Sequence, residues 1–204
     1  MRGSNAKKVK VNLYVEGGGE TADTQKPLRD AFHQFLDPHL PRSPGILCCG
    51  GRSNTLRDFR NGVRDKRDEV HILLLDSERP VASSTRDHLV AEFGAADVPA
   101  IGDDHFQLMT PVMETWIPAD PSSITKAFPR DADIAQIPAW PDIEAVPKQT
   151  IYDTLVKASG GRYAQDDKRL PAAKILKHAD ATTVRSKPTP HCERLLTVLN
   201  TLLS

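Results

Sequence analysis

The sequence lacks the features that mark several large classes of protein. No apolar stretch approaches the length of a transmembrane helix and no secretory signal opens the chain, so we expect a cytoplasmic protein that does not enter the membrane. The only cysteines are Cys48, Cys49 and Cys192. Their number is odd and their spacing matches neither a zinc site nor a disulfide framework, so reduced thiols are the simplest interpretation.

Motifs of several enzyme classes are also missing. The seven histidines form no His-Glu-x-x-His pattern, which disfavours zinc chemistry. There is no Gly-x-Ser-x-Gly elbow to present a nucleophilic serine. Glycines 17–19 are followed by Glu-Thr, not by the Lys-Ser/Thr of a phosphate-binding loop, and they lack the spacing of a dinucleotide site. An ATPase or dinucleotide-binding function is therefore disfavoured.

The charge is balanced overall but unevenly distributed. The 204 residues carry a formal net charge of zero, yet residues 1–147 hold 17 Lys+Arg against 22 Asp+Glu, and residues 148–204 hold 10 against 5. An acidic core followed by a basic flank suits a metal site beside a polyanion-binding surface. Chance segregation of solvated charges is the alternative.

Two predicted strands end in acidic residues. Residues 72–75 form a short apolar run that leads to Asp76 and Glu78, and residues 11–15 lead to Glu16 and three glycines. Such runs indicate buried strands of a parallel sheet, whose ligand sites lie beyond the carboxyl ends of the strands. Asp76 and Glu78 are two apart, so they point the same way if the chain is still extended. Convergent carboxylates need a positive partner, usually a divalent cation.

A purely structural role for these acids is the competing interpretation. Asp76 or Glu78 could cap a helix that follows the strand, and Arg79 could serve as an internal counter-ion. Capping explains one acid, but it does not explain both of them together with Glu16. We therefore favour a functional acidic cluster.

The order of predicted elements indicates the fold class. Helical spacing of apolar residues predicts helices over 21–37, from Asn54 or Thr55 to about residue 66, and over 83–93, with further strands over 45–49 and 104–109. This alternation predicts an α/β fold with a doubly wound, mainly parallel four-stranded sheet in residues 8–110. Prolines are frequent in residues 111–204, which we expect to form a helical elaboration packed on one edge of the sheet, within a single compact unit.

Two charged residues of this second part stand out. Glu114 lies in an apolar, aromatic context just past the fourth strand, and it either faces the surface at a helix start or turns into the site as another ligand. Lys148 follows Pro147 at a predicted helix start, where the helix dipole disfavours a cation. That placement suggests a role beside phosphate, with a solvent-exposed lysine as the alternative.

These residues together resemble a known fold. A strand ending in Glu-Gly, followed later by a hydrophobic strand ending in Asp-x-Asp or Asp-x-Glu, resembles the TOPRIM fold of topoisomerases, bacterial primases and the overcoming-lysogenisation-defect nucleases. Glu16 matches the first motif, and Asp76 with Glu78 matches the second, although Glu78 stands where many TOPRIM enzymes have aspartate. A longer glutamate side chain can still bind a metal, so we expect altered geometry at this position and retained function.

Residues 8–200 as a whole resemble a TOPRIM-like domain family whose members are often encoded beside AAA-type ATPases in bacterial defence islands. The further matching stretches are Cys49-Gly50-Gly51-Arg52, Met-Glu-Thr-Trp-x-x-Ala-Asp at 113–120, and Pro147-Lys148. The resemblance implies a nuclease that uses Mg²⁺ or Mn²⁺ to cleave phosphodiester bonds in DNA or RNA, as the effector of an anti-phage defence system. The implied partners are nucleic acid and an AAA-type ATPase. Whether the protein also forms a homodimer is left open by the sequence.

The resemblance also implies a role for each site residue. Asp76 and Glu78 hold the metal, Glu16 binds a second metal or acts as general base, and Glu114 is an additional ligand. Phosphate charge is neutralised by Arg52 and Lys148, and the catalytic set consists of Glu16, Asp76, Glu78 and Lys148. The alternative function is that of a non-catalytic partner subunit of an AAA-type ATPase, which binds nucleic acid or a phosphate-bearing ligand.

Overall fold

A parallel β-sheet forms the centre of the molecule. The computed structural model describes residues 9–163 and 169–204. Its sheet has four strands in the order β2-β1-β3-β4, and all three pairings are parallel. The strands are β1 (Val11–Val15), β2 (Gly45–Cys48), β3 (Val70–Asp76) and β4 (Phe106–Met109). The predicted four-stranded parallel α/β sheet is confirmed.

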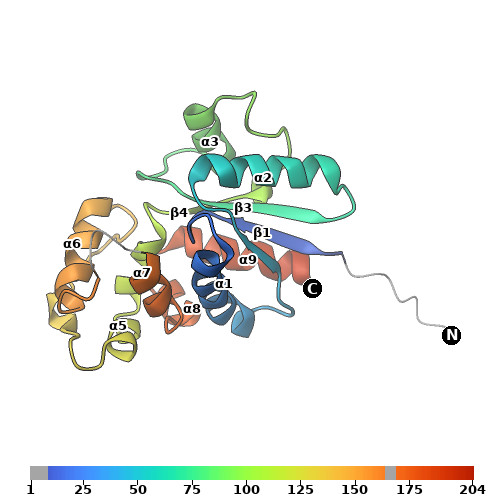
Figure 1. The fold of residues 1–204 in the computed structure, drawn as a ribbon. Coiled ribbons are helices and arrows are strands. Elements are labelled where there is room, and N and C mark those ends of the chain that lie inside the picture. Colours follow the sequence, from blue (N-terminus) through green and yellow to red (C-terminus); the bar gives the residue numbers. More distant parts are fainter. Residues whose placement is uncertain (1–8, 164–168) are drawn as a thin grey trace.

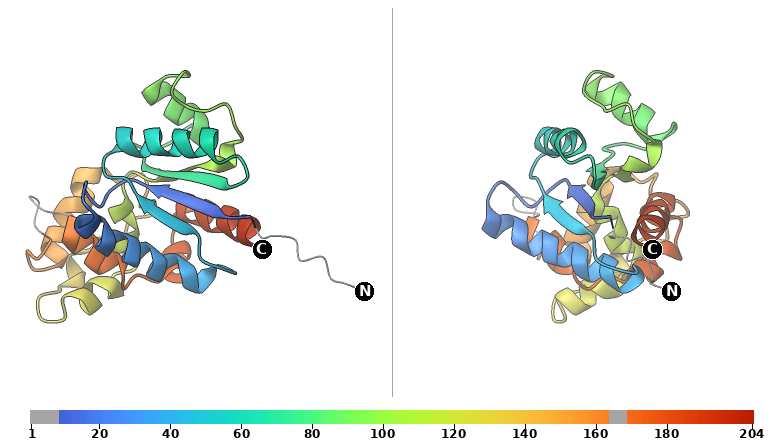
Figure 2. Two further views of the ribbon diagram at one scale, coloured as in Figure 1. Left: turned by 45° about the vertical axis from the view of Figure 1, so that its right-hand side comes forward. Right: turned by 90° about the vertical axis from the view of Figure 1, so that its right-hand side faces the viewer.

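Two pairs of helices cover the two faces of this sheet (Figures 1 and 2). One face carries α1 (Ala22–Leu36) and α9 (Pro190–Leu203), and the other carries α2 (Arg52–Asp65) and α3 (Thr85–Phe93). Successive strand residues point to opposite faces. Leu13 and Leu74 accordingly join the apolar cluster of α1 and α9, whereas Tyr14 and Leu73 join that of α2 and α3. The sheet is doubly wound, as predicted.

The two helices beside the glycine loops begin differently. The side chain of Thr21 accepts a hydrogen bond from the Thr24 N–H, which closes a capping box at the start of α1. The prediction that Asn54 or Thr55 caps the next helix is wrong, because α2 begins at Arg52 and its N-cap residue is Gly51, in an extended conformation with no side-chain cap. The earlier start places Arg52 at the carboxyl edge of the sheet.

Between β4 and α9 the chain forms a series of short helices. They are η3 (Met113–Thr115), α4 (Trp116–Ala119), α5 (Ser122–Ala127), η4 (Ile134–Gln136), α6 (Lys148–Ala158), α7 (Arg169–Leu176) and α8 (Ala181–Arg185). In Figure 1, α5, α6 and α7 lie beyond the carboxyl ends of the strands. Trp116 stacks on Phe35 of α1, with ring centroids 5.2 Å apart, so the helical part shares a core with the sheet. The division at residue 111 stays a prediction.

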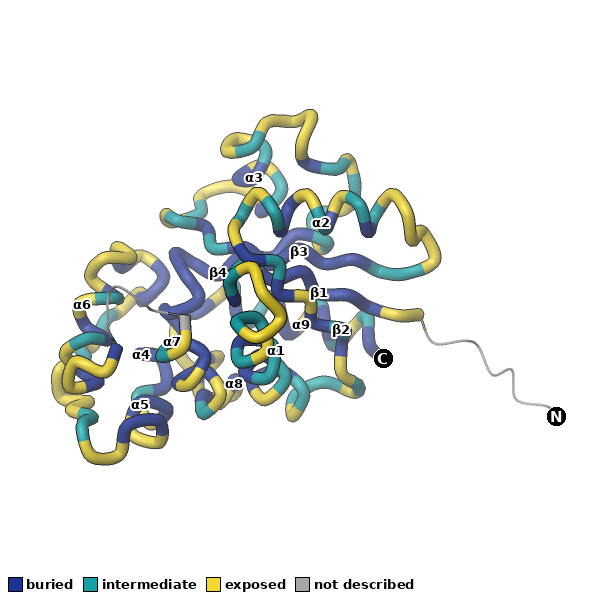
Figure 3. Tube along the Cα trace, viewed as in Figure 1, coloured by how far each residue is buried: buried dark blue, intermediate teal, exposed yellow. Residues whose placement is uncertain are grey.

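The distribution of burial fits this arrangement. Figure 3 shows the central strands as buried, while buried and exposed positions alternate along α2 and α6.

Two further 3₁₀ helices lie in the connections between elements. They are η1 (Asp37–His39) and η2 (Asp103–His105). None of the helices in the described ranges is both long enough and apolar enough to cross a membrane.

Candidate metal and phosphate site

Three carboxylates converge at the carboxyl edge of the sheet. Glu16 follows β1, Asp76 is the last residue of β3, and Glu78 lies two residues further on. One oxygen of each side chain lies within 4.8 Å of those of the other two. The neighbouring strands β1 and β3 run parallel with Val15 opposite Leu74, so their ends bring these acids together. An all-oxygen donor set of this kind suits a hard divalent cation such as Mg²⁺ or Mn²⁺.

Glu78 reaches the cluster through a turn, because β3 has already ended. Its φ angle is 63°, in the left-handed region that a non-glycine residue seldom adopts. Backbone hydrogen bonds fix the turn: the Ser77 N–H donates to the Met109 carbonyl at 2.9 Å, and the Glu78 N–H donates to that of Pro111 at 2.8 Å. The chain is therefore not extended from Asp76 to Glu78, so the condition attached to their convergence is not met, although the two side chains do converge. Local strain of this kind is often found at functional sites.

Backbone hydrogen bonds also orient the other two acids. The Asp76 N–H donates to Glu16 Oε2 at 3.1 Å, and the Met113 N–H donates to Asp76 Oδ1 at 2.9 Å. Each carboxylate is thus held through one oxygen, and the other oxygen, Glu16 Oε1 or Asp76 Oδ2, has no backbone hydrogen bond among those found between described residues. Met113 begins η3, so the segment after β4 helps to position the cluster.

The protein neutralises this cluster incompletely. Burial raises the pKa of Glu16 to about 7, although Arg52 and the Asp76 N–H act in the opposite direction. Burial also raises the pKa of Asp76 well above its ordinary value, and the charges of Glu16 and Glu114 raise it further. Both shifts show that negative charge is costly here, since each acid is partly desolvated and close to another. A bound divalent cation would relieve that cost.

Two cations border the acids. Arg52 Nε lies 3.8 Å from Glu16 Oε2, and Arg52 Nη1 lies 3.7 Å from Glu78 Oε1. Lys148, the first residue of α6, forms an ion pair with Glu78. Lys148, at a helix start where the dipole disfavours a cation, thus lies at the cluster. Arg52 and Lys148 are close enough to meet a phosphate held beside the acids.

Sequence reasoning missed the residue that holds Arg52. Glu92, near the end of α3, places Oε1 only 2.7 Å from Arg52 Nη2, and the guanidinium also lies over the ring of Phe93. The contact with Glu92 is the shortest ion pair of Arg52, but it does not have hydrogen-bond geometry. The Nε and Nη2 atoms of Arg52 are buried and have no hydrogen-bond partner among the described residues. No local pattern in the sequence links positions 52 and 92, because the contact depends on how two helices pack on one face of the sheet.

Glu114 lies deeper than the three converging acids. It is buried, with 8% of its surface exposed, so the surface-facing alternative is wrong. Its Oε1 accepts a hydrogen bond of 2.8 Å from the hydroxyl of Tyr163. Among the described residues, the group whose oxygens converge contains the three acids of the strand ends and does not contain Glu114. The charge of Glu114 nevertheless raises the pKa of Asp76. The role of Glu114 as a metal ligand stays a prediction.

The purely structural interpretation of the acids does not fit the geometry. The side chain of Ser84 caps α3 by accepting a hydrogen bond from the Asp87 N–H at 3.1 Å, so neither Asp76 nor Glu78 is needed there. None of the ion pairs found between described residues includes Arg79, whose side of the turn is exposed. The counter-ions of the cluster come instead from α2 and α6.

Comparison with known proteins agrees with this architecture. The C-terminal region of the Burkholderia pseudomallei OLD protein is similar in structure, with a TM-score of 0.53 and 14% sequence identity over 96% of this chain and 99% of that one. This similarity shows the TOPRIM-like fold predicted from the sequence. No curated protein shows significant sequence similarity to the chain. The family model described as domain of unknown function DUF4276 matches residues 15–200, and the chain therefore belongs to that family.

Proposed function

We propose that this protein is a divalent-metal-dependent nuclease that cleaves phosphodiester bonds in DNA or RNA. The observation that carries the proposal is the convergence of Glu16, Asp76 and Glu78 within 4.8 Å at the edge of a parallel sheet where ligands bind. Arg52 and Lys148 lie beside these acids. Metal-dependent cleavage of a phosphodiester uses carboxylates that hold the cation and positively charged side chains that contact the phosphate.

The donor set fits Mg²⁺ or Mn²⁺ better than a soft metal. Carboxylate oxygens of Asp76 and Glu78 would hold the ion, with Glu114 as an additional ligand, and Glu16 would either bind a second ion or act as general base. When bound, such an ion polarises a phosphate oxygen and stabilises the charge that develops on the leaving oxygen. The raised pKa of Glu16 and of Asp76 supports this assignment, because unneutralised carboxylates at this depth favour a cation.

The chain's own residues provide the remaining steps. Glu16 is held through Oε2 by the Asp76 N–H, so its Oε1 is placed to accept a proton from the attacking water. Lys148 and Arg52 exchange part of their contact with Glu78 for the phosphate oxygens, and so neutralise negative charge in the transition state.

Cleavage assays with matched variants test this proposal. We would incubate labelled single- and double-stranded DNA and RNA with the protein, with Mg²⁺, with Mn²⁺ or with chelator. We expect metal-dependent cutting that falls at least about a hundredfold in Asp76→Asn, which keeps an acceptor for the Met113 N–H but loses the charge. The control is Asp65→Asn, which removes an aspartate paired with Arg64 on the exposed surface of α2.

The results separate catalysis from binding. Equal cutting by wild type and Asp76→Asn would show that the acids are not the catalytic site. Binding of nucleic acid without cutting, with every metal, would instead favour the non-catalytic subunit of an AAA-type ATPase. We propose the ATPase partner and the anti-phage role on the family resemblance alone, and co-purification with the product of a neighbouring ATPase gene tests them.

A further inference from the structure

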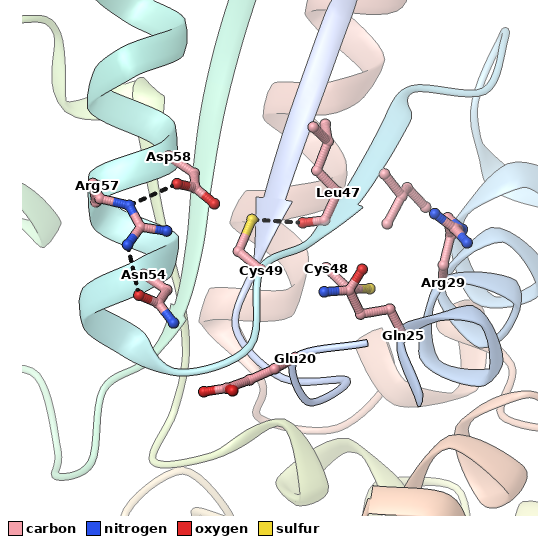
Figure 4. Close-up of a pocket in the computed structure, with 10 residues that line it drawn as sticks. Glu20, Gln25, Arg29, Leu47, Cys48, Cys49, Asn54, Arg57 and Asp58 are labelled. Atoms are coloured by element: carbon pink, nitrogen blue, oxygen red, sulfur yellow. Dashed lines mark hydrogen bonds and ion pairs between the residues drawn. The ribbon is translucent and has the colours of Figure 1, made fainter. Parts of the chain in front are cut away.

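A second cavity lies beside the acidic cluster. It has a volume of about 560 Å³ and lies at the carboxyl end of β2, between α1 and α2 (Figure 4). Glu20 lines this cavity and also lines the hollow that contains Glu16 and Asp76. We propose that the cavity, hereafter the β2 pocket, receives a base of the nucleic-acid strand next to the phosphate that is cleaved. This inference rests on the proposed function and adds a base-binding site to it.

The wall between the two cavities is thin. It is formed by the glycine loop of residues 17–19, where Gly18 has a φ angle of 82° and packs against the floor of the β2 pocket. A Cβ added to Gly18 would lie 3.2 Å from the Cβ of Cys48 and 3.0 Å from the Cα of Gln25. The Gln25 side chain donates to the Gly19 carbonyl at 3.3 Å, which ties the loop to α1. A strand whose phosphate lies at the acids therefore passes over this loop directly into the pocket.

The charge of the pocket indicates a neutral ligand. Arg29 and Arg57 line it together with Glu20 and Asp58, so the two positive charges are matched by two negative ones. Arg57 is already paired, since its Nε donates to Asp58 at 3.0 Å. A pocket with balanced charge attracts phosphate poorly, but its donors and acceptors suit the edge of a base.

The polar groups can also recognise a base by shape and hydrogen bonding. The Asn54 Oδ1 atom accepts a hydrogen bond of 3.0 Å from Arg57 Nη1, which leaves the Asn54 amide NH₂ group to donate to a ligand. Figure 4 shows both side chains on the α2 side of the opening. The guanidinium plane of Arg57 is exposed and provides a surface on which a base can stack.

The two thiols of the pocket do not provide an alternative chemistry. Burial raises the pKa of Cys48 to about 11 and that of Cys49 to about 12, so both stay protonated near neutral pH. Cys49 donates its S–H to the Leu47 carbonyl at 3.3 Å. A protonated thiol is neither a good nucleophile nor a good metal ligand, and the floor of the pocket is accordingly uncharged.

The test compares strands with and without bases. We would measure the binding of fluorescein-labelled single strands of DNA and RNA, and of matched strands that keep the sugars and phosphates but lack bases, by fluorescence anisotropy in Mg²⁺ and in chelator. The ratio of the two dissociation constants isolates the contribution of the bases from that of the phosphates. We expect wild type to prefer the base-bearing strand by about tenfold, and Asn54→Ala or Arg57→Ala to remove most of that preference.

The chain provides a close control for Arg57→Ala. Arg64 lies two helical turns further along α2, is similarly exposed and is likewise paired with the aspartate that follows it. Arg64→Ala thus removes the same charge away from the β2 pocket, and we expect it to keep the preference for bases. An equal loss of preference in Arg57→Ala and Arg64→Ala, or no preference in wild type, would overturn the proposal.

The outcome is independent of whether the protein cuts nucleic acid. Loss of base preference in Arg57→Ala without any cleavage by wild type would support the pocket and contradict the nuclease. Cleavage by wild type with the same base preference in both arginine variants would support the nuclease and overturn the pocket.

Discussion

Two arginines at opposite ends of the sheet meet their acidic neighbours in different ways. Arg194 of α9 donates to the Phe106 carbonyl at 2.7 Å, to Thr85 Oγ1 at 2.9 Å and to Asp103 Oδ2 at 2.8 Å. Arg52, at the carboxyl end, approaches Glu16 and Glu78 only to 3.8 and 3.7 Å, and its 2.7 Å contact with Glu92 lacks hydrogen-bond geometry. The first arginine has its hydrogen bonds satisfied within the protein, and the second does not.

This difference separates an arginine that holds the fold together from an arginine at the proposed ligand site. Arg194 joins α9, the start of α3 and the start of β4 through fixed hydrogen bonds, which is a structural arrangement. The acids beside Arg52 outnumber the cations in contact with them, and the pKa of Glu16 and of Asp76 is raised. Incomplete neutralisation of this kind marks a functional site.

The largest effect on stability should come from the structural arginine. Arg194→Ala removes the side chain that donates to the Phe106 carbonyl, to Thr85 Oγ1 and to Asp103 Oδ2, so we expect the free energy of unfolding to fall by about 2–4 kcal/mol, as measured in denaturant. Arg185→Ala is the control, because Arg185 makes an exposed pair with Glu193, and it should cost less than about 1 kcal/mol. Similar losses in the two variants would contradict the structural role of Arg194.

A smaller effect should appear in the pH dependence of stability. The pKa of Glu16 is about 7 in the folded protein, above its value in the unfolded chain, so the folded state binds the extra proton between these two pKa values. The free energy of unfolding, measured with chelator, should therefore fall by about 2 kcal/mol as the pH rises from about 5 to about 8.

The variant Glu16→Gln isolates this effect from other titrating groups. It should reduce the fall in stability to the part that Asp76 contributes, whereas Glu69→Gln, at a glutamate whose pKa is lowered, should leave the fall unchanged. Added Mg²⁺ should restore stability to wild type at pH 8, because a bound cation replaces the missing positive charge. The same pH dependence in wild type and Glu16→Gln would refute the assignment.

The smallest effect concerns Glu92, which draws Arg52 away from the acids. In Glu92→Gln, Arg52 should pair more strongly with Glu16 and Glu78 and so compete with the metal. We expect the Mg²⁺ concentration for half-maximal cleavage to rise about threefold, equivalent to about 0.6 kcal/mol. Asp97→Asn, which disrupts an exposed pair with Arg60, serves as the control. An unchanged metal requirement in Glu92→Gln would show that Glu92 does not position Arg52.

The sequence predicted the features that depend on local pattern. The apolar run before Asp76 and the alternation before Glu16 are signals within single strands, and parallel pairing then places both acids at one edge. Lys148 stands out in the sequence because the helix dipole disfavours a cation at a helix start. These inferences needed only the period of strands and helices and the direction of the sheet.

The features that the sequence did not predict depend on tertiary contacts. The left-handed conformation of Glu78 is held by the carbonyl of Pro111, and Arg52 is held by Glu92. Glu114 is oriented by Tyr163, 49 positions further along the chain. Each partner lies on a different element, so no spacing in the sequence connects it with the site.

Whether the acidic cluster is a metal site is decided by measuring metal binding itself. Mn²⁺ would be titrated into wild type and Asp76→Asn and followed by electron paramagnetic resonance, with Asp65→Asn as the control. We expect binding to wild type and to the control, and an affinity at least about tenfold weaker for Asp76→Asn. Equal Mn²⁺ affinity in all three proteins, or no binding to wild type, would contradict the assignment of the acidic cluster as a metal site.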